Sequence, residues 1–524
     1  MLSLLNLAEF LLATPLLLCL LYTLYLLYVH QIYSHIPGPP VESFFLGNLP
    51  TIRGTYKKGV YSHILFLDWA RKYGPVYKIF VLHKCMVFLS NPSVIKEVLT
   101  RSRYRKASMT YSRLYSVCGE RFLGHGLVTM MNHKLWKRRR AIINPAFHKN
   151  CDYVDCGCWN FGHFASTGMP QSTHLEMRAS VRLLSKMMDQ FNEMADKWLN
   201  QLEPLADGGN YFDMAEYFGR VTLDVIGKVA FGANFHALDD VESPFRKALW
   251  HILEGYSAQL RDPLLQLRFS KRQFVQKVQR AVDIVRSEGQ RIFTNHDKEK
   301  EDHHDNILHH IIKYTDILPN LSEADLLDEF CMMLIAGQET TSNMLGFLFK
   351  ELGNNDGVLE RMLEEMNQVL GERDNVTFDD INRLEYLGQV IKETLRLYPP
   401  AMGTARESVD RTVLHGYHIP SGTQLVVSFY IVHHMPEYFP DPDTFRPERF
   451  DPDATRKLYT FMPFSLGQRS CVGRHFAMIE AKVLLCKFFK KFTFELEPNQ
   501  LEGIQETTTL RPKGGVRMRL SQTS

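Results

Sequence analysis

The chain has 524 residues, of which 45% are hydrophobic and 23% are charged, a globular composition that excludes a wholly disordered or collagen-like chain. Its 61 basic and 58 acidic residues leave a net charge of +3, which argues against a nucleic-acid-binding protein. Nine cysteines are too few for a disulfide-stabilised scaffold in a chain of this length, so each is considered individually.

An apolar segment near the N-terminus is long enough to cross a membrane. Residues 10–29 carry no charge, and a helix rising about 1.5 Å per residue spans a hydrocarbon core of about 30 Å over that length. A cleaved signal peptide is the alternative, but Glu9 precedes the segment without any basic residue, and no small-residue cleavage site follows. We predict a signal anchor over 10–29, a short luminal N-terminus over 1–9 and a Pro-rich hinge over 30–50.

Basic residues follow the apolar segment, first at Arg53, Lys57 and Lys58, and none precedes it. Because positive residues favour the cytosolic side of a membrane, this asymmetry places residues 51–524 in the cytosol. We therefore expect a single-pass protein of the endoplasmic reticulum membrane.

The rest of the chain predicts a mainly α fold with small β-sheets, an α+β class. Alternating residues at 76–81 and 86–90 predict a β-hairpin, and the periodicity is helical from about 175 to 400. Residues 412–429 and 492–520 are again rich in strand signals. No fixed-period repeat and no dividing linker is visible, so we predict one mixed domain after the hinge.

One cysteine lies in a glycine-punctuated loop before a predicted helix. The loop reads FSLGQRSCVG over residues 464–473, and the helix is expected from about Arg474 to Phe489. A thiolate at Cys471 would be stabilised by the helix N-terminus and by the charge of Arg469. The alternative for a single cysteine is a small buried hydrophobe, which we expect for most of the nine.

The string F-x-x-G-x-R-x-C-x-G, complete from Phe464 to Gly473, resembles the haem-ligand signature of the cytochrome P450 family. The resemblance implies the cytochrome P450 fold and a haem b (iron protoporphyrin IX) with Cys471 as the axial iron ligand. It also implies monooxygenation, in which O₂ and two electrons convert RH to ROH and water. Since no flavin or nicotinamide motif occurs here, NADPH would act indirectly, through an NADPH-cytochrome P450 reductase.

Two further motifs match the family's structural charge network. Glu393 and Arg396 stand at i and i+3, a spacing that surface helices also show, but their context YLGQVIKETLRLYPP resembles the family's K helix. Arg449 of the later string PERF would be the third member. The resemblance implies a buried network that holds the haem-binding core and has no catalytic role.

Residues 336–341 read AGQETT within a helix that begins near Ser322 with a capping-box-like pattern. Tolerated weak helix formers are the alternative explanation. The resemblance implies that Gly337 lets the helix approach the haem, and that Glu339 and Thr340 deliver protons to dioxygen, with the threonine hydroxyl loosening the helix.

The string WKRRR over 136–140 puts its first and last residues on one helical face. The resemblance implies that Trp136 and Arg140 bind a haem propionate, with Arg406 and Arg469 as further partners. The other basic residues nearby form either a solvated helix face or a docking surface for an acidic reductase: Lys134, Lys137, Arg138 and Arg139.

Several segments are similar to the cholesterol 24-hydroxylases of the family, among them HIPGPP at 35–40, FLDWA at 66–70 and GERF at 119–122. The similarity implies hydroxylation of a sterol, on the cholesterol side chain, in a mainly apolar pocket. The candidate pocket residues are Ala336, Thr340, Ala401, Met402, Gly403 and Thr404, with the segments 109–128 and 506–508. The alternatives are a fatty-acid or xenobiotic hydroxylase of the same family, or a catalytically silent haem-binding membrane protein.

The chain departs from the family pattern between Phe147 and Phe191, which 43 residues separate, roughly thirty more than relatives lead us to expect. This predicts an insert at about 149–180. Its cysteines and histidines suggest a zinc site, but their spacing is not the usual paired one. A disordered loop, or a mis-predicted or alternatively spliced stretch, is the preferred interpretation.

Overall fold

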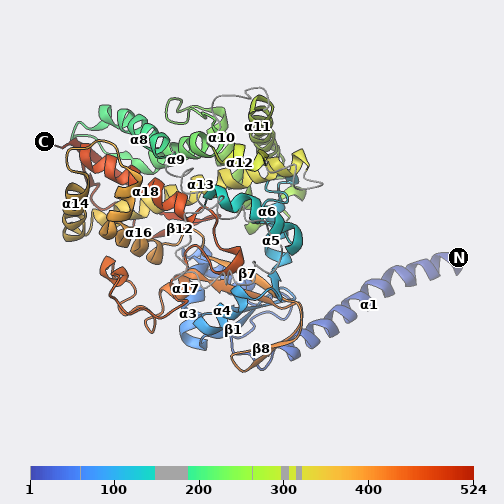
Figure 1. Cartoon of the computed structure of the whole chain (residues 1–524). Helices are drawn as coiled ribbons and strands as arrows, with labels where there is room; N and C mark the ends of the chain where they lie inside the picture. Colours follow the sequence, from blue (N-terminus) through green and yellow to red (C-terminus); the bar gives the residue numbers. More distant parts are fainter. Residues whose placement is uncertain are drawn as a thin grey trace, which may run out of the picture.

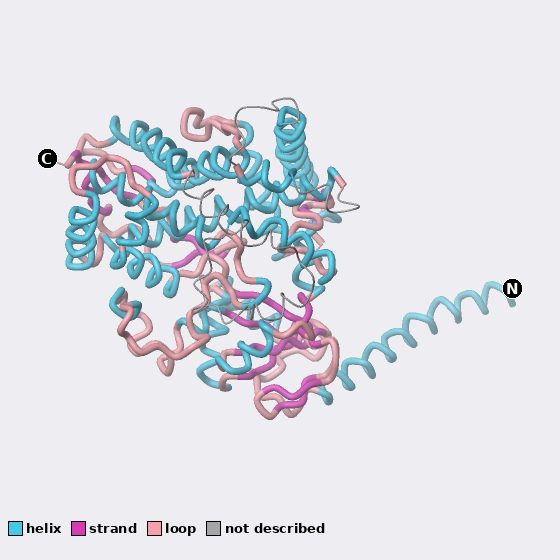
Figure 2. Tube along the Cα trace, in the orientation of Figure 1, coloured by secondary structure: helices cyan, strands magenta, loops and turns pink. Residues whose placement is uncertain are grey.

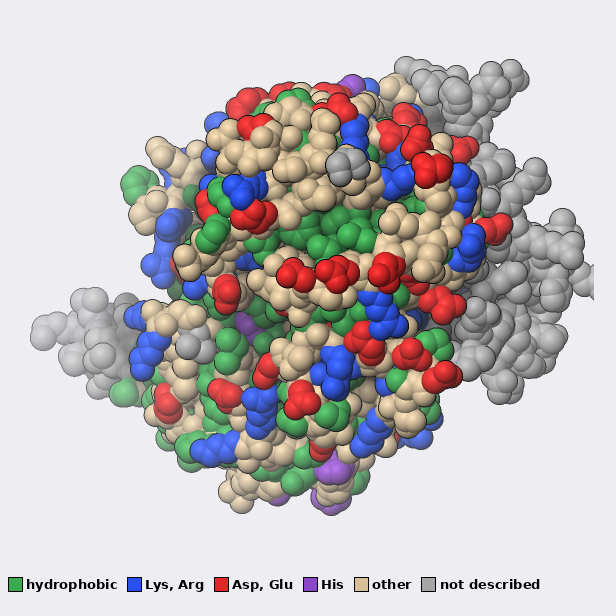
Figure 3. Space-filling model, turned by 90° about the vertical axis from the view of Figure 1, so that its left-hand side faces the viewer, with side chains coloured by type: hydrophobic (Ala, Val, Ile, Leu, Met, Phe, Trp, Pro, Cys, Tyr) green, Lys and Arg blue, Asp and Glu red, His purple; other side chains and the backbone are tan. Residues whose placement is uncertain are grey.

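The computed structural model describes residues 2–59, 61–147, 187–262, 264–296, 306–313 and 322–523. The insert predicted at about 149–180 lies outside the described residues. Helices dominate, and the strands form one five-stranded sheet and several smaller ones in separate places, so the predicted mainly α class with small sheets is confirmed (Figure 2). Acidic and basic side chains are interspersed over the described surface of the face in Figure 3, consistent with the small net charge.

The helices are α1 (Leu2–Ile32), α2 (Leu49–Lys57), α3 (Ser62–Tyr73), α4 (Pro92–Thr100), α5 (Ser108–Tyr115), α6 (His133–Phe147), α8 (Met188–Leu202), α9 (Met214–Val225), α10 (Pro244–Arg261), α11 (Arg272–His296), α12 (Ile307–Lys313), α13 (Glu323–Leu352), α14 (Asp356–Leu370), α15 (Phe378–Arg383), α16 (Glu385–Leu397), α17 (Phe429–His433) and α18 (Arg474–Lys491). A π-helical turn η4 (Ile226–Ala230) and the 3-10 helices η3 (Glu203–Leu205), η5 (Leu265–Leu267), η6 (Phe269–Lys271), η8 (Pro447–Phe450) and η9 (Gly467–Arg469) connect them.

The strands are β1 (Val76–Val81), β2 (Lys84–Leu89), β3 (Tyr104–Lys106), β4 (Ser116–Val117), β5 (Glu120–Arg121), β6 (Phe212–Asp213), β7 (Gly403–Ser408), β8 (Thr412–Leu414), β9 (Tyr417–Ile419), β10 (Gln424–Ser428), β11 (Phe492–Leu496), β12 (Ile504–Glu506), β13 (Leu510–Pro512) and β14 (Arg517–Gln522). The largest sheet has the order β1-β2-β10-β7-β3, and a second has the order β11-β14-β6.

The N-terminal helix α1 projects away from the rest of the chain (Figure 1). Its part from Thr14 to Ile32 is the one helix among the described residues that is long and apolar enough to cross a membrane. It ends three residues beyond the predicted span, where the Lys78 ammonium donates to Tyr33 O at 2.5 Å and to Ile36 O at 2.6 Å. The base of α1 is therefore tied to β1.

The largest sheet carries two residues to the site described below. The predicted hairpin is confirmed, but β2 begins at Lys84, two residues earlier than expected. Leu82 adopts a φ of 55°, which allows a two-residue turn between β1 and β2. β10 then pairs in parallel with β2 and antiparallel with β7, and β3 completes the sheet. This order places Lys106 of β3 opposite Arg406 of β7.

Helix α13 passes through the helical region and contacts α9, α11, α16 and α18 (Figure 1). It begins where the sequence predicts, because Ser322 and Asp325 form a capping box with both hydrogen bonds at 3.2 Å. Most of its length is buried in the main apolar core. A helix so enclosed is a rigid support for polar groups that face the site.

Glu393, Arg396 and Arg449 form a buried network. The Glu393 carboxylate accepts two hydrogen bonds from Arg396, both at 2.7 Å, and one from Arg449 Nε at 3.2 Å. Arg396 Nη1 also donates to His433 O and Pro442 O, while Arg449 donates to Asp441 O. Burial lowers the pKa of Arg449, which the Glu393 charge opposes. The network thus joins α16 to the irregular chain that precedes the Cys471 loop.

We expect Glu393→Gln to lower the free energy of unfolding by about 3–5 kcal/mol, because two guanidinium groups would stay buried without their counter-charge. Urea denaturation of the solubilised protein, followed by circular dichroism, measures the change. The control is Glu385→Gln at the exposed start of the same helix, which should shift stability by less than about 0.5 kcal/mol. Equal midpoints for wild type and Glu393→Gln would contradict a stabilising role.

Candidate active site

The loop that carries Cys471 is shaped by a glycine. Gly467 has a φ of +73°, and a Cβ there would lie 2.3 Å from Leu99 O of α4, so no other residue fits without displacement. The Cys471 N–H then donates to Phe464 O at 2.8 Å, which closes the loop. Gly473 precedes α18, which starts at Arg474 as predicted. The Cys471 thiol is exposed at the start of this helix.

The electrostatic surroundings of Cys471 differ in part from the prediction. Partial desolvation by the adjoining protein raises the pKa of the thiol, while the Gly473 N–H and the charges of Arg140 and Arg474 act to lower it. Arg140 Nη1 donates to Ser470 O at 2.8 Å, next to the cysteine. Arg469, which the sequence predicted to act on this thiol as well, is not among the charges that lower its pKa, and its guanidinium bonds Leu127 O and Met130 O. A bound metal ion would favour the thiolate over the thiol.

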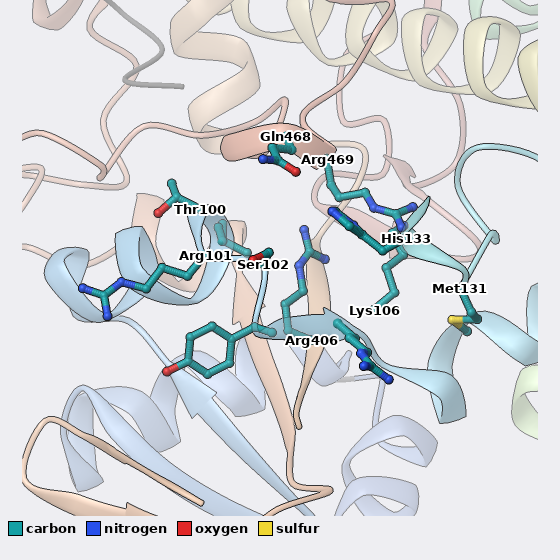
Figure 4. A pocket seen from close by; sticks show the side chains of 12 residues that line it. Thr100, Arg101, Ser102, Lys106, Met131, His133, Arg406, Gln468 and Arg469 are labelled. Carbon is teal, nitrogen blue, oxygen red and sulfur yellow. The ribbon is translucent and has the colours of Figure 1, made fainter. Parts of the chain in front are cut away.

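Cationic side chains surround a hollow between β3, β7, η9 and the start of α6 (Figure 4). About 400 Å³ there is free of atoms, part of it open to solvent, and no acidic residue is among its described lining. Arg406 and Arg469 point into this hollow from β7 and η9 (Figure 4). The basic and histidine residues of the lining are Arg101, Arg105, Lys106, His133, Arg406 and Arg469.

Three of these groups lie close together, with Arg406 buried and Lys106 and Arg469 half-buried. Burial lowers the pKa of Arg406, while burial and the charge of Arg406 lower that of Arg469 to about 9. The pKa of Lys106 is also lowered, by burial and by both arginines. Arg406 Nη2 is buried and has no hydrogen-bond partner among the described residues. An orphaned guanidinium donor among uncompensated charges fits an anion, and the two carboxylates of a haem beside a free thiol satisfy both requirements.

The predicted Trp136–Arg140 pair separates. Arg140 contacts Asn144 and Ser470, on the side of Cys471. Trp136 instead supports Arg469, whose guanidinium carbon lies 3.9 Å from the centre of the indole ring. Arg469 also donates to Met130 O at 3.0 Å and Leu127 O at 3.4 Å.

On α13, the motif residues have separate contacts. Thr340 Oγ1 donates to Ala336 O at 2.7 Å, the back-bonding expected of a mid-helix threonine, although the helix is continuous there. The Glu339 carboxylate accepts from Thr509 Oγ1 at 2.9 Å and from Asn343 Nδ2 at 3.2 Å. The two neighbours therefore do not bond to each other.

Gly337 packs against the π-helical turn η4. A Cβ on Gly337 would lie 2.9 Å from Ile226 Cδ1 of that turn. The space that a side chain would occupy thus faces a neighbouring helical turn, and the approach of this glycine to a haem stays a prediction.

The candidate substrate residues lie on α13 and around the start of β7. Ala336, Ala401 and Gly403 are exposed, while Met402 and Thr404 are half-buried. Thr404 Oγ1 is 2.8 Å from Tyr111 OH, and it accepts a hydrogen bond from Arg406 Nη1. Tyr111 lies within the segment 109–128 predicted to line the pocket.

Glu506, from a segment predicted to line the pocket, and Arg139, predicted on the basic helix face, both form contacts inside the protein. The Glu506 carboxylate accepts hydrogen bonds from Ser62 N and Oγ and lies 3.2 Å from His63 Nδ1, so it holds α3 rather than lining a pocket. Arg139 was grouped with the exposed basic residues, but it is largely buried and pairs with Asp325 and Glu329. Lys106 and His133 were not predicted at the hollow, and no sequence motif marks them.

Comparison with known proteins supports the assignment of the fold. A family model, Cytochrome P450, matches residues 37–155 and 172–518 and omits 156–171, inside the predicted insert. Over 484 residues the chain is 28% identical to cytochrome P450 4d2 of Drosophila melanogaster, covering 87% of this chain and 88% of that protein.

Two more relatives have names that state a reaction. Carotene epsilon-monooxygenase, chloroplastic, of Arabidopsis thaliana is 29% identical, with 87% of this chain and 81% of that protein covered. Taurochenodeoxycholic 6 alpha-hydroxylase of Sus scrofa is 29% identical, with 83% of this chain and 82% of that protein covered. Because the family model matches most of the sequence, including the Cys471 loop, the chain belongs to the cytochrome P450 family of haem-dependent monooxygenases.

Proposed function

We propose that the chain is a haem-thiolate monooxygenase that hydroxylates a sterol, with the cholesterol side chain as the first candidate. The reaction consumes O₂ and two electrons, which a separate NADPH-cytochrome P450 reductase supplies, and yields ROH and water. The observation that carries this proposal is the exposed Cys471 thiol at the start of α18, close to a hollow lined by cations without an acid among its described residues.

Each site residue then has a role. Cys471 would hold the iron of haem b, and Arg406 and Arg469 would bind the haem carboxylates. The haem, when bound, supplies the activation of dioxygen. Thr340 carries an exchangeable proton at Oγ1 on the helix that holds Ala336, and Glu339 is the adjacent acid.

The remaining motif residues have supporting roles. Trp136 positions Arg469, and Arg140 places its charge beside Cys471. Phe464 and Gly473 shape the cysteine loop.

The sterol proposal rests on the similarity to cholesterol 24-hydroxylases and on the exposed small residues Ala336, Ala401 and Gly403. The names of two relatives refer to a bile acid and a carotene, both large lipophilic molecules. A fatty-acid or xenobiotic hydroxylase is the competing function.

The membrane arrangement is part of the proposal. Residues 10–29 of α1 would be a single-pass anchor in the endoplasmic reticulum, with residues 1–9 luminal and 51–524 cytosolic. Lys134, Lys137 and Arg138 are exposed on α6 and are the proposed docking surface for an acidic reductase.

We expect the reduced, CO-treated protein to show a strongly red-shifted Soret band that is lost in Cys471→Ala, because a thiolate ligand is the source of that shift. Difference spectra of membrane-expressed protein measure it. The matched control is Cys486→Ala, a buried cysteine on α18, which should keep the band. Haem incorporation without the shift in wild type would contradict thiolate ligation.

We expect Thr340→Ala to bind haem normally but to form about tenfold less product per NADPH consumed, because a positioned proton donor is lost. Product and NADPH are measured in the reconstituted system with the reductase. Thr341→Val is the control, since Thr341 is buried and its hydroxyl bonds Glu480. Unchanged coupling in Thr340→Ala would rule out its proton-delivery role.

The substrate class is tested by titrating the haem-loaded protein with cholesterol, a long-chain fatty acid and a lipophilic drug. We expect the sterol alone to displace water from the site, seen as a change in the haem absorption spectrum, and mass spectrometry to find a side-chain hydroxylated sterol. Turnover of the fatty acid but not the sterol would favour the competing function.

A further inference from the structure

Two adjacent carboxylates of α13 bind the segment between β5 and α6. Asp328 is fully buried and accepts hydrogen bonds from Arg121 Nη2 at 2.5 Å, His125 N at 2.8 Å and Arg286 Nη1 at 3.0 Å. Gly124 is required here, because a Cβ would lie 2.1 Å from the Asp328 carboxylate. This segment is therefore fixed to α13 at its first turn.

The second carboxylate, Glu329, reaches the middle of the segment. Its Oε2 accepts a hydrogen bond from Leu127 N at 3.0 Å, and its Oε1 lies 3.5 Å from Arg139 Nη1. Arg139 also donates to His125 O at 2.9 Å, and it pairs with Asp325 at 3.0 Å. Glu329 thus bonds the N–H of Leu127 directly. It also lies beside Arg139, which in turn bonds the carbonyl of His125.

The carbonyls of the same segment hold Arg469. Leu127 O and Met130 O accept hydrogen bonds from Arg469 Nη1, and the guanidinium lies over Trp136. The guanidinium is therefore held by two carbonyls of this segment and by a ring of α6, the helix that follows it. The chain of contacts runs from Glu329 through the Leu127 peptide to Arg469.

We propose that Glu329 is a positioning residue for Arg469, which it aims at a haem carboxylate through the Leu127 peptide. The proposal rests on the proposed function, in which Arg469 binds that carboxylate. No contact between Glu329 and the site itself is involved.

The burial of Glu329 supports a positioning role over a purely stabilising one. Burial raises the pKa of its carboxyl to about 7, while the Leu127 N–H and Arg139 act to lower it. The desolvation of a buried carboxylate offsets most of the free energy gained from its ion pairs. An apolar side chain at this position would therefore stabilise the core at least as well. The charged or titratable groups that face the Glu329 carboxyl or the segment between β5 and α6 are Asp325 and Asp328 of α13, Arg139 of α6, Arg121 of β5, Arg286 of α11 and His125.

The test measures how tightly the loaded protein keeps its haem, by transfer to excess apomyoglobin. We expect Glu329→Gln to release haem about fivefold faster than wild type, because a charged hydrogen bond to the segment is lost. The matched control is Glu351→Gln, which removes a half-buried carboxylate of α13 whose partners are Tyr398 OH at 2.6 Å and Asn355 Nδ2 at 3.3 Å, both outside the segment. Its release rate should equal that of wild type.

A double-variant cycle distinguishes positioning from general destabilisation. If Glu329 acts through Arg469, adding Glu329→Gln to Arg469→Leu leaves the release rate of Arg469→Leu unchanged. A further fivefold increase in the double variant would overturn the proposal, as would an unchanged rate in Glu329→Gln alone.

The wild-type pH profile is an independent readout. Below pH 7 the Glu329 carboxyl becomes neutral and its hold on Leu127 N and Arg139 weakens, so haem release should accelerate as the pH falls from 8 to 6. Glu329→Gln should lack this part of the profile, and an identical profile in both proteins would overturn the proposal.

Two outcomes separate this inference from the proposed function. If Glu329→Gln does not fold, Arg139→Gln is tested in its place, since it removes the cation that links Glu329 to the carbonyl of His125. If wild type takes up no haem, the proposed function fails and the inference with it. Haem uptake with the Cys471-dependent spectrum but without an effect of either variant overturns the inference alone.

Discussion

Positive charge concentrated around a partly buried hollow is the constraint on which the rest of this structure depends. Arg406 lowers the pKa of Arg469, both arginines lower that of Lys106, and Arg140 adds a further cation beside Cys471. Such groups repel one another, so they stay in place only if the surrounding chain holds each one. A bound anion would relieve this repulsion.

Each cation is held by backbone carbonyls or by an aromatic ring rather than by an acid. Arg469 is held by Leu127 O, Met130 O and Trp136, Arg140 by Ser470 O, and Arg406 by Ala405 O. Neutral acceptors orient a guanidinium without cancelling its charge. The full positive charge is thus available to a ligand with two carboxylates.

Among the described residues, the nearby carboxylates do not bond these cations directly but bond the segments and side chains around them. Asp328 and Glu329 bind the segment that supplies the carbonyls, and Glu393 binds the arginines that shape the chain before the Cys471 loop. Buried carboxylates therefore fix the positions of irregular segments, and the carbonyls of these segments fix the positions of the arginines.

Much of this architecture could be predicted from local patterns. The Cys471 loop, the start of α18, the capping box of α13 and the β1–β2 hairpin follow from residues within one or two turns of each other, as does the pairing of Glu393 with Arg396. The inward turn of Arg139, the packing of Gly337 on Ile226 and the hold of Glu329 on Leu127 could not be predicted. The last of these joins residues 202 positions apart. Its only local signal was a pair of acids inside an otherwise apolar stretch of α13.

The sequence by itself determined the family, since the Cys471 loop is a short motif whose chemistry is local, and it named Arg140, Arg406 and Arg469 as site residues but not Lys106 or His133. Only the tertiary structure decided the contacts of each cation. Arg140 lies beside the thiol, Arg469 lies over Trp136, and Arg406 keeps one donor without a partner among the described residues. The physical reason is that a guanidinium reaches several acceptors from one backbone position. Which of them it bonds depends on segments that folding brings together from distant parts of the chain.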